Sequence, residues 1–310
     1  MTHEVTYTAS MSSYEAIAVR AIRMLGTRMY RSKDGWPRDM KPVDAYINTL
    51  AGDRARAISS VLRNIDSPHV PNRYFGGRLA ESLCNPIEES ETKQAESILR
   101  AICGKVAHEG DERVLTQYVR AIGMGAAYSS FVVPRLLELS RSELFNVRLC
   151  ATQSLNMAQL DDTYGAVVIE RLIRLSSDAE AEIRNWATFA LATGDDLDHE
   201  SLSIRAALVQ RLQDPDMEVR DEAIDGLANR GDERGIIPLL KRLRMVSVTN
   251  LNVRSAGTYG DPLFYEDLVR VAATYPANEY DHWAQLRCNL DPAIRAATPD
   301  FDTYENSLHD

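Results

Sequence analysis

Small and apolar residues recur every three or four positions along much of the chain, a spacing that is typical of one face of an α-helix. The clearest example is a set of three segments that align without gaps and lie 36 residues apart, at 146–155, 182–191 and 218–227. Each segment has an aliphatic residue, an alanine four positions later and a leucine eight positions later, with a small residue before the leucine. This stripe predicts an amphipathic helix, and the small residue lets a neighbouring helix approach closely.

A second amphipathic segment accompanies each of these helices. Residues 132–140 and 168–176 align at the same spacing of 36, and residues 207–212 and 236–243 are later copies. A single pair of such helices cannot bury its apolar faces, whereas stacked pairs bury them against one another. The repeat therefore predicts an all-α fold of the α-α superhelix type, an α-solenoid of stacked helix pairs.

Residues 214–243 connect the repeat to a known family. Their sequence, DPDMEVRDEAIDGLANRGDERGIIPLLKRL, closely resembles the short bacterial HEAT-like repeat, which also occurs in phycobiliprotein lyases and is called the PBS-lyase type. The resemblance covers residues 110–245 well and extends weakly to either side. It implies a HEAT-like α-solenoid, and it implies no single function because such folds serve many functions.

The N-terminal flank is less regular than the repeats. We expect residues 1–92 to form a helical region with a basic bias, including an amphipathic helix over 12–31 and one or two helices over 42–65. Residues 66–92 contain three prolines and two glycines, and this composition predicts an irregular loop.

The C-terminal flank also departs from the repeat pattern. We expect the HEAT-like solenoid to span residues 93–245, and a divergent repeat or cap with a polar tail to follow over 246–310. Within the cap, the Asn-Val-Arg sequence of residues 252–254 echoes the repeat, and Gly257 and Gly260 are expected to break it. Divergent terminal repeats are typical of solenoid caps.

Charge is distributed unevenly along the chain. The whole chain carries 35 Lys and Arg against 45 Asp and Glu, a net charge of −10. Residues 1–78 hold 12 basic and 7 acidic residues, so residues 79–310 hold 23 and 38. A phosphate backbone selects for Lys and Arg, so this composition argues against a nucleic-acid partner and favours a protein partner with a basic surface.

The cysteines and the hydropathy of the chain indicate a location. The four cysteines are scattered and form no C-x-x-C pair, which argues against a zinc site. The first residues lack the basic and apolar regions of a signal peptide, and no apolar run approaches the ~18 residues that cross a bilayer. We therefore expect a cytoplasmic protein with no membrane partner, no metal and no other cofactor.

The residues that follow each repeated Val-Arg or Ile-Arg bear on an enzymatic function. Some HEAT-repeat hydroxylases, which this repeat resembles, hold a di-iron centre with His-Glu pairs at that position. Here the position holds Leu149-Cys150, Asn185-Trp186 and Asp221-Glu222. The sequence therefore predicts no iron site and no catalytic residue.

Two further enzyme classes remain as alternatives. One HEAT-like family removes alkylated bases from DNA with aromatic residues and an aspartate on a basic concave face, and Trp186 lies on a repeat helix. However, residues 177–235 hold 15 acidic and 6 basic residues, and this field repels a phosphate backbone. A HEAT-like lyase is the other alternative, although no pattern marks a tetrapyrrole pocket.

Binding of another protein is the function that the sequence favours. The chain is expected to be a non-enzymatic scaffold, such as an immunity protein that sequesters a basic toxin. Solenoids present one helix of each pair along a concave surface, so the polar positions of the second helices are candidates for partner binding. They are Arg135, Glu138, Arg171, Arg174, Gln210, Lys241 and Arg242.

Two loop regions add further candidates. Trp36, Tyr74 and Phe75 lie close to arginines in the sequence, and aromatic and arginine side chains dominate interface hot spots. An acidic loop, which either recognises a partner or is simply solvated, adds Asp195, Asp196 and Asp198.

Arginine recurs at one place in every repeat, as Arg148, Arg184 and Arg220. This regularity predicts a structural role, a ladder of ion pairs between repeats with Asp178 and Asp214 as acceptors.

Overall fold

The computed structural model of the chain describes residues 13–31, 36, 39–85, 89–126, 130–158, 164–193, 201–274 and 281–298. These residues form sixteen α-helices and three short 3₁₀ helices, and no β-strand occurs among them. The all-α fold expected from the sequence is thus confirmed. The chain divides into two compact units, Met1–Tyr164 and Gly165–Asp310, which we call the N-terminal unit and the C-terminal unit.

The N-terminal unit contains the first eight helices. They are α1 (Ser13–Arg31), α2 (Lys41–Ala51), α3 (Arg54–Ile65), α4 (Val70–Leu83), α5 (Glu89–Val106), α6 (Glu112–Ala126), α7 (Val133–Leu139) and α8 (Phe145–Asn156). The helices expected over 12–31 and 42–65 are confirmed as α1, α2 and α3. The buried side chains of α1 follow helical spacing, at Ala18, Ala21, Leu25 and Met29.

The C-terminal unit contains the other eight helices. They are α9 (Gly165–Leu175), α10 (Ala181–Thr193), α11 (Leu202–Arg211), α12 (Met217–Ala228), α13 (Ile236–Leu243), α14 (Asn250–Tyr259), α15 (Tyr265–Thr274) and α16 (Asp281–Ala297). Asp216 fixes the start of α12, because its carboxylate accepts hydrogen bonds from the N–H groups of Glu218 and Val219. The polar tail beyond residue 298 lies outside the described residues.

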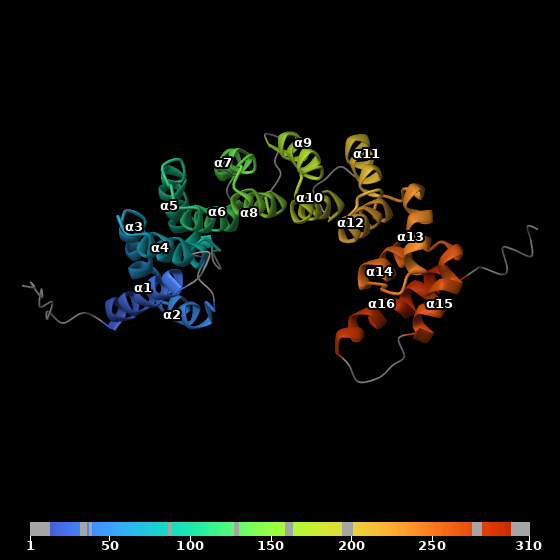
Figure 1. The fold of residues 1–310 in the computed structure, drawn as a ribbon, viewed down its shortest axis with the longest axis horizontal. Helices are drawn as coiled ribbons and strands as arrows, with labels where there is room; N and C mark the ends of the chain where they lie inside the picture. Colours follow the sequence, from blue (N-terminus) through green and yellow to red (C-terminus); the bar gives the residue numbers. More distant parts are fainter. Residues whose placement is uncertain are drawn as a thin grey trace, which may run out of the picture. The chain divides into compact units, whose positions relative to one another are not determined.

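Within each unit the helices form two layers (Figure 1). The inner layer consists of α4, α6 and α8 in one unit and of α10, α12, α14 and α16 in the other, and each inner helix packs against the next one of its own unit. The outer layer consists of α3, α5 and α7, and of α9, α11, α13 and α15. A Cβ atom on Gly226 of α12 would lie 2.8 Å from the Cβ atom of Ala192 in α10, so small residues permit this close packing. The stacked pairs confirm the solenoid.

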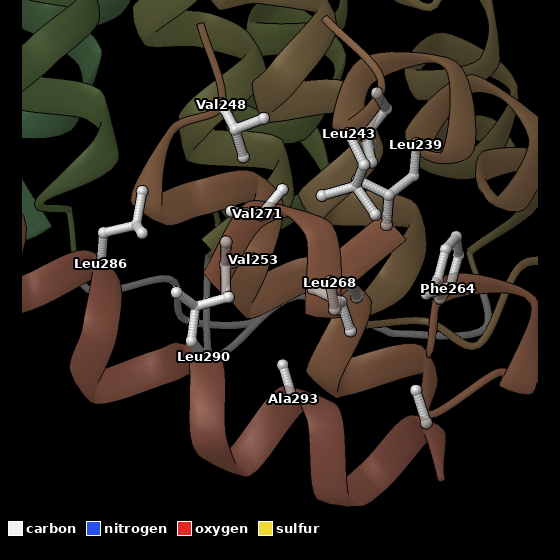
Figure 2. Close-up of a cluster of buried hydrophobic side chains, with 13 residues drawn as sticks. Leu239, Leu243, Val248, Val253, Phe264, Leu268, Val271, Leu286, Leu290 and Ala293 are labelled. Carbon is white, nitrogen blue, oxygen red and sulfur yellow. The ribbon is translucent and has the colours of Figure 1, made fainter. Parts of the chain in front are cut away.

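A hydrophobic core joins the divergent cap to the last regular repeat (Figure 2). Leu239 of α13, Val253 of α14, Leu268 of α15 and Leu290 of α16 meet there, together with Ile224 of α12. All five side chains are at most 3% exposed. The last helices are therefore part of the packed unit, as expected for a solenoid cap.

The repeated arginine is the fourth residue of α8, α10 and α12. It stabilises the turn that precedes each helix through hydrogen bonds. In each helix its Nη1 atom donates to the two carbonyl groups that lie five and six residues earlier. The acceptors are Ser142 and Glu143 for Arg148, Asp178 and Ala179 for Arg184, and Asp214 and Pro215 for Arg220. Arg184 also forms two hydrogen bonds of 2.9 Å with the carboxylate of Asp214 in the next repeat. The ion pair between repeats expected at Asp214 is thus confirmed.

The loop expected over 66–92 is wrong for about two thirds of its length, because Val70–Leu83 forms α4 and Glu89 begins α5. Pro71 lies in the first turn of α4, where the N–H group that proline lacks has no intrahelical partner. Gly76 and Gly77 lie inside the helix. A Cβ atom on Gly77 would be 2.9 Å from the Cγ atom of Gln117 in α6, so α6 leaves no room for a larger side chain there. These glycines permit close packing of helices and do not form a turn.

The helix α4 extends the arginine ladder into the N-terminal flank. Arg73, its fourth residue, donates to the carbonyl groups of Ser67 and Pro68, as the other repeated arginines do in their turns. Its Nε and Nη2 atoms donate to the carboxylate of Glu109 at 2.7 and 3.0 Å. The repeat geometry therefore begins at least as early as α4.

The cap departs from the repeat by one residue. The third residue of α12 is the buried Val219, whereas the third residue of α14 is the buried Asn252, which completes a capping box with Thr249. Arg254 is consequently the fifth residue of its helix and donates to Asp225 of α12 at 2.8 Å. The expected echo at 252–254 is therefore shifted along the helix.

The two glycines of the cap have different roles. Gly260 ends α14 in the left-handed conformation, with φ of 62°, as expected for a glycine that breaks the repeat. Gly257 does not break the helix, and a Cβ atom there would lie 3.2 Å from the Cβ atom of Ala293 in α16. It permits close packing, as Gly77 does in α4.

Candidate protein-binding surface

One face of each regular inner helix carries side chains whose exposure differs from helix to helix, from exposed to buried. It consists of the second, fifth, sixth and ninth residues of the helix, a spacing that places them on one side. In α10 these are Glu182, Asn185, Trp186 and Phe189, which are exposed or half-buried. We call these four positions in α4, α6, α8, α10 and α12 the inner stripe.

In α4, α8, α10 and α12 the fifth and sixth residues of the helix directly follow the repeated arginine, whereas in α6 they follow Leu115. The pairs after the arginine include Leu149-Cys150, Asn185-Trp186 and Asp221-Glu222. From the sequence, these pairs bear on iron binding, and Trp186 also on base removal from DNA, but their place on the inner surface was not predicted. Their place directly after the repeated arginine is the signal that could have found this surface.

In the N-terminal unit the inner stripe lines a pocket of about 330 Å³. The lining residues come from three inner helices and from the segment before α2. They are Trp36, Met40, Tyr74, Arg78, Arg113, Thr116, Gln117, Arg120, Asn146, Leu149 and Cys150. The pocket thus combines aromatic and apolar side chains with three arginines.

Carboxylates outside the lining hold two of these arginines in place. Arg78 donates to Asp44 at 2.5 Å and to Glu81 at 2.7 Å. Arg113 donates to Asp111 at 2.5 and 3.0 Å. Because their partners are fixed, the two guanidinium groups have defined orientations.

Other polar groups of the lining are free to interact. The Oγ1 atom of Thr116, a residue that is only 4% exposed, and the Nε atom of Arg78 have no hydrogen-bond partner among the described residues. Arg120 is exposed, and no carboxylate in the described part of the chain forms an ion pair with it. The pocket therefore offers hydrogen-bond donors that the fold itself does not use.

In the C-terminal unit the inner stripe is acidic. On α12 its four positions hold Glu218, Asp221, Glu222 and Asp225, and on α10 the first position holds Glu182. Glu182 and Glu218 are exposed and occupy equivalent places on adjacent inner helices. A basic surface would find complementary charge along this stripe.

Arginines neutralise two of these carboxylates. The Nε atom of Arg242 donates to Asp221 at 2.8 Å, and both side chains are almost fully buried. Arg254 donates to Asp225 at 2.8 Å, and the hydroxyl group of Ser255 donates to the same carboxylate at 2.9 Å. These two pairs connect α12 to α13 and α14, so they belong to the fold.

Glu222 has no such compensation. Burial raises the pKa of its carboxyl group to about 7, and the neighbouring charge of Asp225 raises it further, while Arg254 opposes the shift. Glu222 therefore changes its charge close to neutral pH.

An aromatic pair lies on the same stripe. The rings of Trp186 and Phe189 meet edge to face, with centroids 5.8 Å apart, and both side chains are half-buried. Glu182 lies one helical turn before Trp186. Partly exposed aromatic side chains surrounded by charge are typical of interface hot spots.

A second hollow, of about 990 Å³, lies between α1 and α3. Val19 and Ile22 of α1 contribute apolar lining, and Arg23, Arg56 and Arg63 contribute positive charge. Three of the arginines that make the N-terminal flank basic therefore lie around this groove.

The candidate residues of the second helices lie in the outer layer, on α7, α9, α11 and α13. The expectation that these helices line the inner side therefore differs from the structure (Figure 1). The first helix of each pair forms the inner layer. The alanines and glycines of α10 and α12 permit the close approach of these helices. Three of the candidates form ion pairs within their own helices: Arg135 pairs with Glu138, and Arg174 pairs with Glu170, which is not a candidate.

Other candidates have mixed outcomes. Arg242 is only 4% exposed and holds Asp221, so it is a core residue and not a surface residue. Gln210 and Lys241 are exposed, and their role in binding stays a prediction, as does that of Arg171. Asp195, Asp196 and Asp198 lie outside the described residues.

The loop aromatics are separated by the fold. Tyr74 and Phe75 lie in α4, and Phe75 is fully buried because it packs in the interior of the N-terminal unit. Tyr74 and Trp36, by contrast, both line the 330 Å³ pocket. The structure therefore brings two of the three predicted loop aromatics together.

Neither a metal-binding cluster nor a membrane-spanning helix occurs among the described residues. They contain no group of three or more His, Cys, Asp or Glu side chains arranged to hold a metal ion. None of their helices is both long enough and apolar enough to span a membrane.

Residues 169–250 match the family model of HEAT repeats, and this match confirms the resemblance found in the sequence for that part of the chain. No curated protein matches the chain in sequence.

Several solved structures are similar to the chain. The X-ray structure of YibA from Escherichia coli aligns with a TM-score of 0.61 over 93% of this chain and 98% of that chain, at 19% identity. The crystal structure of an engineered protein aligns with a TM-score of 0.55 over 91% of this chain and 78% of that chain, at 16% identity. At such identities the likeness shows the fold and does not assign a function.

Proposed function

We propose that the chain is a cytoplasmic, non-enzymatic scaffold that binds a protein partner with a basic surface through the inner stripe of its C-terminal unit. One observation carries this proposal: the partly exposed Trp186–Phe189 pair is flanked by the exposed carboxylates of Glu182 and Glu218. The proposal is supported by the HEAT-repeat fold, whose stacked helices form extended surfaces for protein binding.

The proposed recognition combines two contacts. An arginine or lysine of the partner stacks on the ring of Trp186 and faces Glu182 one turn away. Further basic side chains face Glu218 and, above neutral pH, the ionised Glu222. Such complementary charge speeds the encounter of the two proteins and fixes their orientation. In its concrete form, the scaffold is an antagonist that sequesters a basic protein, such as an immunity protein that blocks a toxin.

The proposal disfavours an enzyme that acts on DNA. The inner stripe of the C-terminal unit presents Glu182, Glu218 and Glu222 where a DNA-binding surface needs Lys and Arg.

The proposal is tested by affinity purification of the tagged chain from its native cells, with mass spectrometry at low and moderate salt. We expect one near-stoichiometric basic protein, whose retention falls about tenfold as salt rises from about 0.05 to about 0.3 M. The variant E182K/E218K is expected to lose this partner. Where the partner is a toxin, co-expression of the chain is expected to relieve its toxicity.

A matched control separates charge from stability. Glu266 is the second residue of α15 and is exposed, as Glu182 and Glu218 are at the second positions of α10 and α12. E266K places a positive charge at the same point of a helix, with the same cost from the helix dipole. The proposal is wrong if E182K/E218K keeps the partner, if E266K loses it equally, or if only nucleic acid, a metal or a pigment co-purifies.

A further inference from the structure

We propose that the pocket of the N-terminal unit is a second binding site, which takes one carboxylate and the apolar side chain next to it from a peptide segment. The lining of this site holds three arginines and no acidic side chain, unlike the acidic stripe of the C-terminal unit, and the proposal does not depend on the function proposed for that stripe. Its lining residues come from α4, α6 and α8 and from Trp36 and Met40.

Three unused donors point to an oxyanion. The hydroxyl group of Thr116 lines the pocket without a partner in the described part of the chain, although the residue is 96% buried, and the Nε atom of Arg78 is likewise unpartnered. A buried polar group without a partner is unfavourable, so a ligand that accepts its hydrogen bond is stabilised at this position. Arg120, which has no ion-pair partner among the described residues, adds a charged donor at the rim.

The local charge balance favours a single carboxylate over a phosphate. The pocket has three arginines, but four carboxylates lie directly behind them. Asp44 and Glu81 bind Arg78, Asp111 binds Arg113, and Glu112 accepts a hydrogen bond of 3.0 Å from Asn146. Arg120 is the one lining arginine without a carboxylate partner in the described part of the chain, so it balances a single negative charge of a ligand, whereas the second charge of a dianionic phosphate finds no free arginine.

The rest of the lining sets the other half of the ligand. Trp36, Tyr74 and Leu149 provide aromatic and apolar surface next to the arginines. A volume of about 330 Å³ corresponds to about eleven water molecules at about 30 Å³ each, which is enough for two adjacent side chains. A short sequence with an acidic residue beside an aromatic one therefore matches the pocket in size and chemistry.

Isothermal titration calorimetry on the full chain tests the proposal with four probes. They are a blocked hexapeptide with a central Glu-Phe pair, the same peptide with Gln-Phe, the same peptide with phosphoserine-Phe, and a single-stranded oligothymidine. We expect the Glu-Phe peptide to bind with a Kd of about 0.1 mM. The Gln-Phe peptide is expected to bind at least about tenfold more weakly, because it lacks the charge.

Two variants and one control connect the binding to the pocket. R120Q removes the exposed guanidinium group and is expected to weaken the Glu-Phe peptide about tenfold. T116V removes only the buried hydroxyl group and is expected to weaken the peptide about fivefold without lowering the melting temperature. R141Q makes the same charge change at an exposed arginine in the turn after α7, outside the pocket, and is expected to leave the affinity unchanged.

Each outcome of the titration decides the proposal. It is overturned if no peptide binds at about 2 mM, if Gln-Phe binds as well as Glu-Phe, or if R120Q and R141Q weaken binding equally. Tighter binding of the phosphopeptide or of oligothymidine also overturns it, because the site then recognises phosphate. The variant E182K/E218K is expected to bind the Glu-Phe peptide normally, so failure of the proposed function and failure of this proposal are distinguishable.

Discussion

At the scale of single residues, the repeated arginine contributes to stability in proportion to the partners it has. Arg184 holds two carbonyl groups and the buried carboxylate of Asp214, whereas Arg220 holds only two carbonyl groups among the described residues. We expect R184A to lower the free energy of unfolding by about 2–3 kcal/mol, because Asp214 loses two hydrogen bonds from a charged donor and keeps the more distant counter-charge of Arg211, at 3.5 Å. R220A is expected to cost only about 1 kcal/mol.

Urea denaturation followed by circular dichroism measures both changes. The lysine variant R184K keeps the charge but loses the two parallel hydrogen bonds, so its loss is expected to fall between the other two. Equal losses for R184A and R220A would show that the ion pair with Asp214 adds nothing to the carbonyl contacts.

Glu222 is a residue whose charge works against the fold. Its pKa in the folded chain is about 7, because burial and the charge of Asp225 disfavour the carboxylate. A folded-state pKa raised above the unfolded value makes stability decline as pH rises from about 4.5 to about 7. We expect E222Q to abolish this decline and to raise the free energy of unfolding at pH 8 by about 1–2 kcal/mol.

Denaturation of the two proteins at pH 4.5 and pH 8 provides the measurement. At pH 4.5 the unmodified chain already holds Glu222 protonated, so E222Q is expected to have almost no effect there. An equal gain at both pH values would contradict the assignment of a raised pKa to this residue.

At the scale of helices, the glycines fall into two kinds: those that face a neighbouring helix and those that face solvent. A Cβ atom on Gly226 of α12 would meet the Cβ and Cα atoms of Ala192 at 2.8 and 2.9 Å, whereas nothing lies within 4 Å of one on Gly104 of α5. We expect G226A to destabilise the chain by about 1–3 kcal/mol, because two inner helices must move apart. G104A is expected to stabilise it by about 0.5–1 kcal/mol through helix propensity.

Thermal unfolding of both alanine variants checks this pair. A loss for G226A with a gain for G104A supports close contact between α10 and α12. A gain for both would mean that the inner helices are not in contact at this point.

The helices of the regular repeats were predictable, whereas their layers were not. The spacing of 36 residues located α8, α10 and α12, because each buries the same Val/Ile, Ala and Leu stripe. The helix α4 was missed because Pro71, Gly76 and Gly77 are typical of loops when contacts are unknown. In the folded chain, Gly77 is needed because Gln117, a residue distant in sequence, packs directly against it.

The candidate site was predictable only in part, for a related reason. Trp36 and Tyr74 were singled out as aromatics near arginines, but their meeting with Arg113 and Arg120 depends on how α4 and α6 stack. The inner face had two sequence signals: the recurrent arginine before a pair of stripe residues, and the small residue in each repeat, which the most closely approaching helices must carry. The second helices of the pairs lack that residue, so their assignment to the concave side did not follow from it.

At the scale of the whole molecule, acid stability is set by several carboxylates with lowered pKa values. Arg234 and Arg205 hold the pKa of Asp232 at about 2 despite its burial. For Asp214, burial alone would raise the pKa, but Arg184 and the N–H group of Asp216 lower it overall. A folded-state pKa below the unfolded value gives stability that is present above about pH 4 and is lost as pH falls through the folded value.

We therefore expect the free energy of unfolding to fall steeply between about pH 4 and about pH 2. D232N removes one of these groups and is expected to reduce the slope of the fall, while lowering stability at pH 7. Denaturation at a series of acidic pH values measures both effects. An unchanged slope in D232N would contradict the lowered pKa of Asp232.

The different side chains of the two inner stripes lead to a final prediction, that only the acidic stripe responds to pH near neutrality. The acidic stripe gains charge as Glu222 ionises, so retention of a basic partner is expected to rise about threefold from pH 6 to pH 8. The pocket around Arg120 contains arginines and a threonine hydroxyl but no histidine, so binding of the Glu-Phe peptide is expected to stay constant over the same interval. Affinities measured at both pH values in the unmodified chain and in E222Q decide the matter. The rise is expected to disappear in E222Q, and a rise that persists there must come from a different group than the one identified on α12.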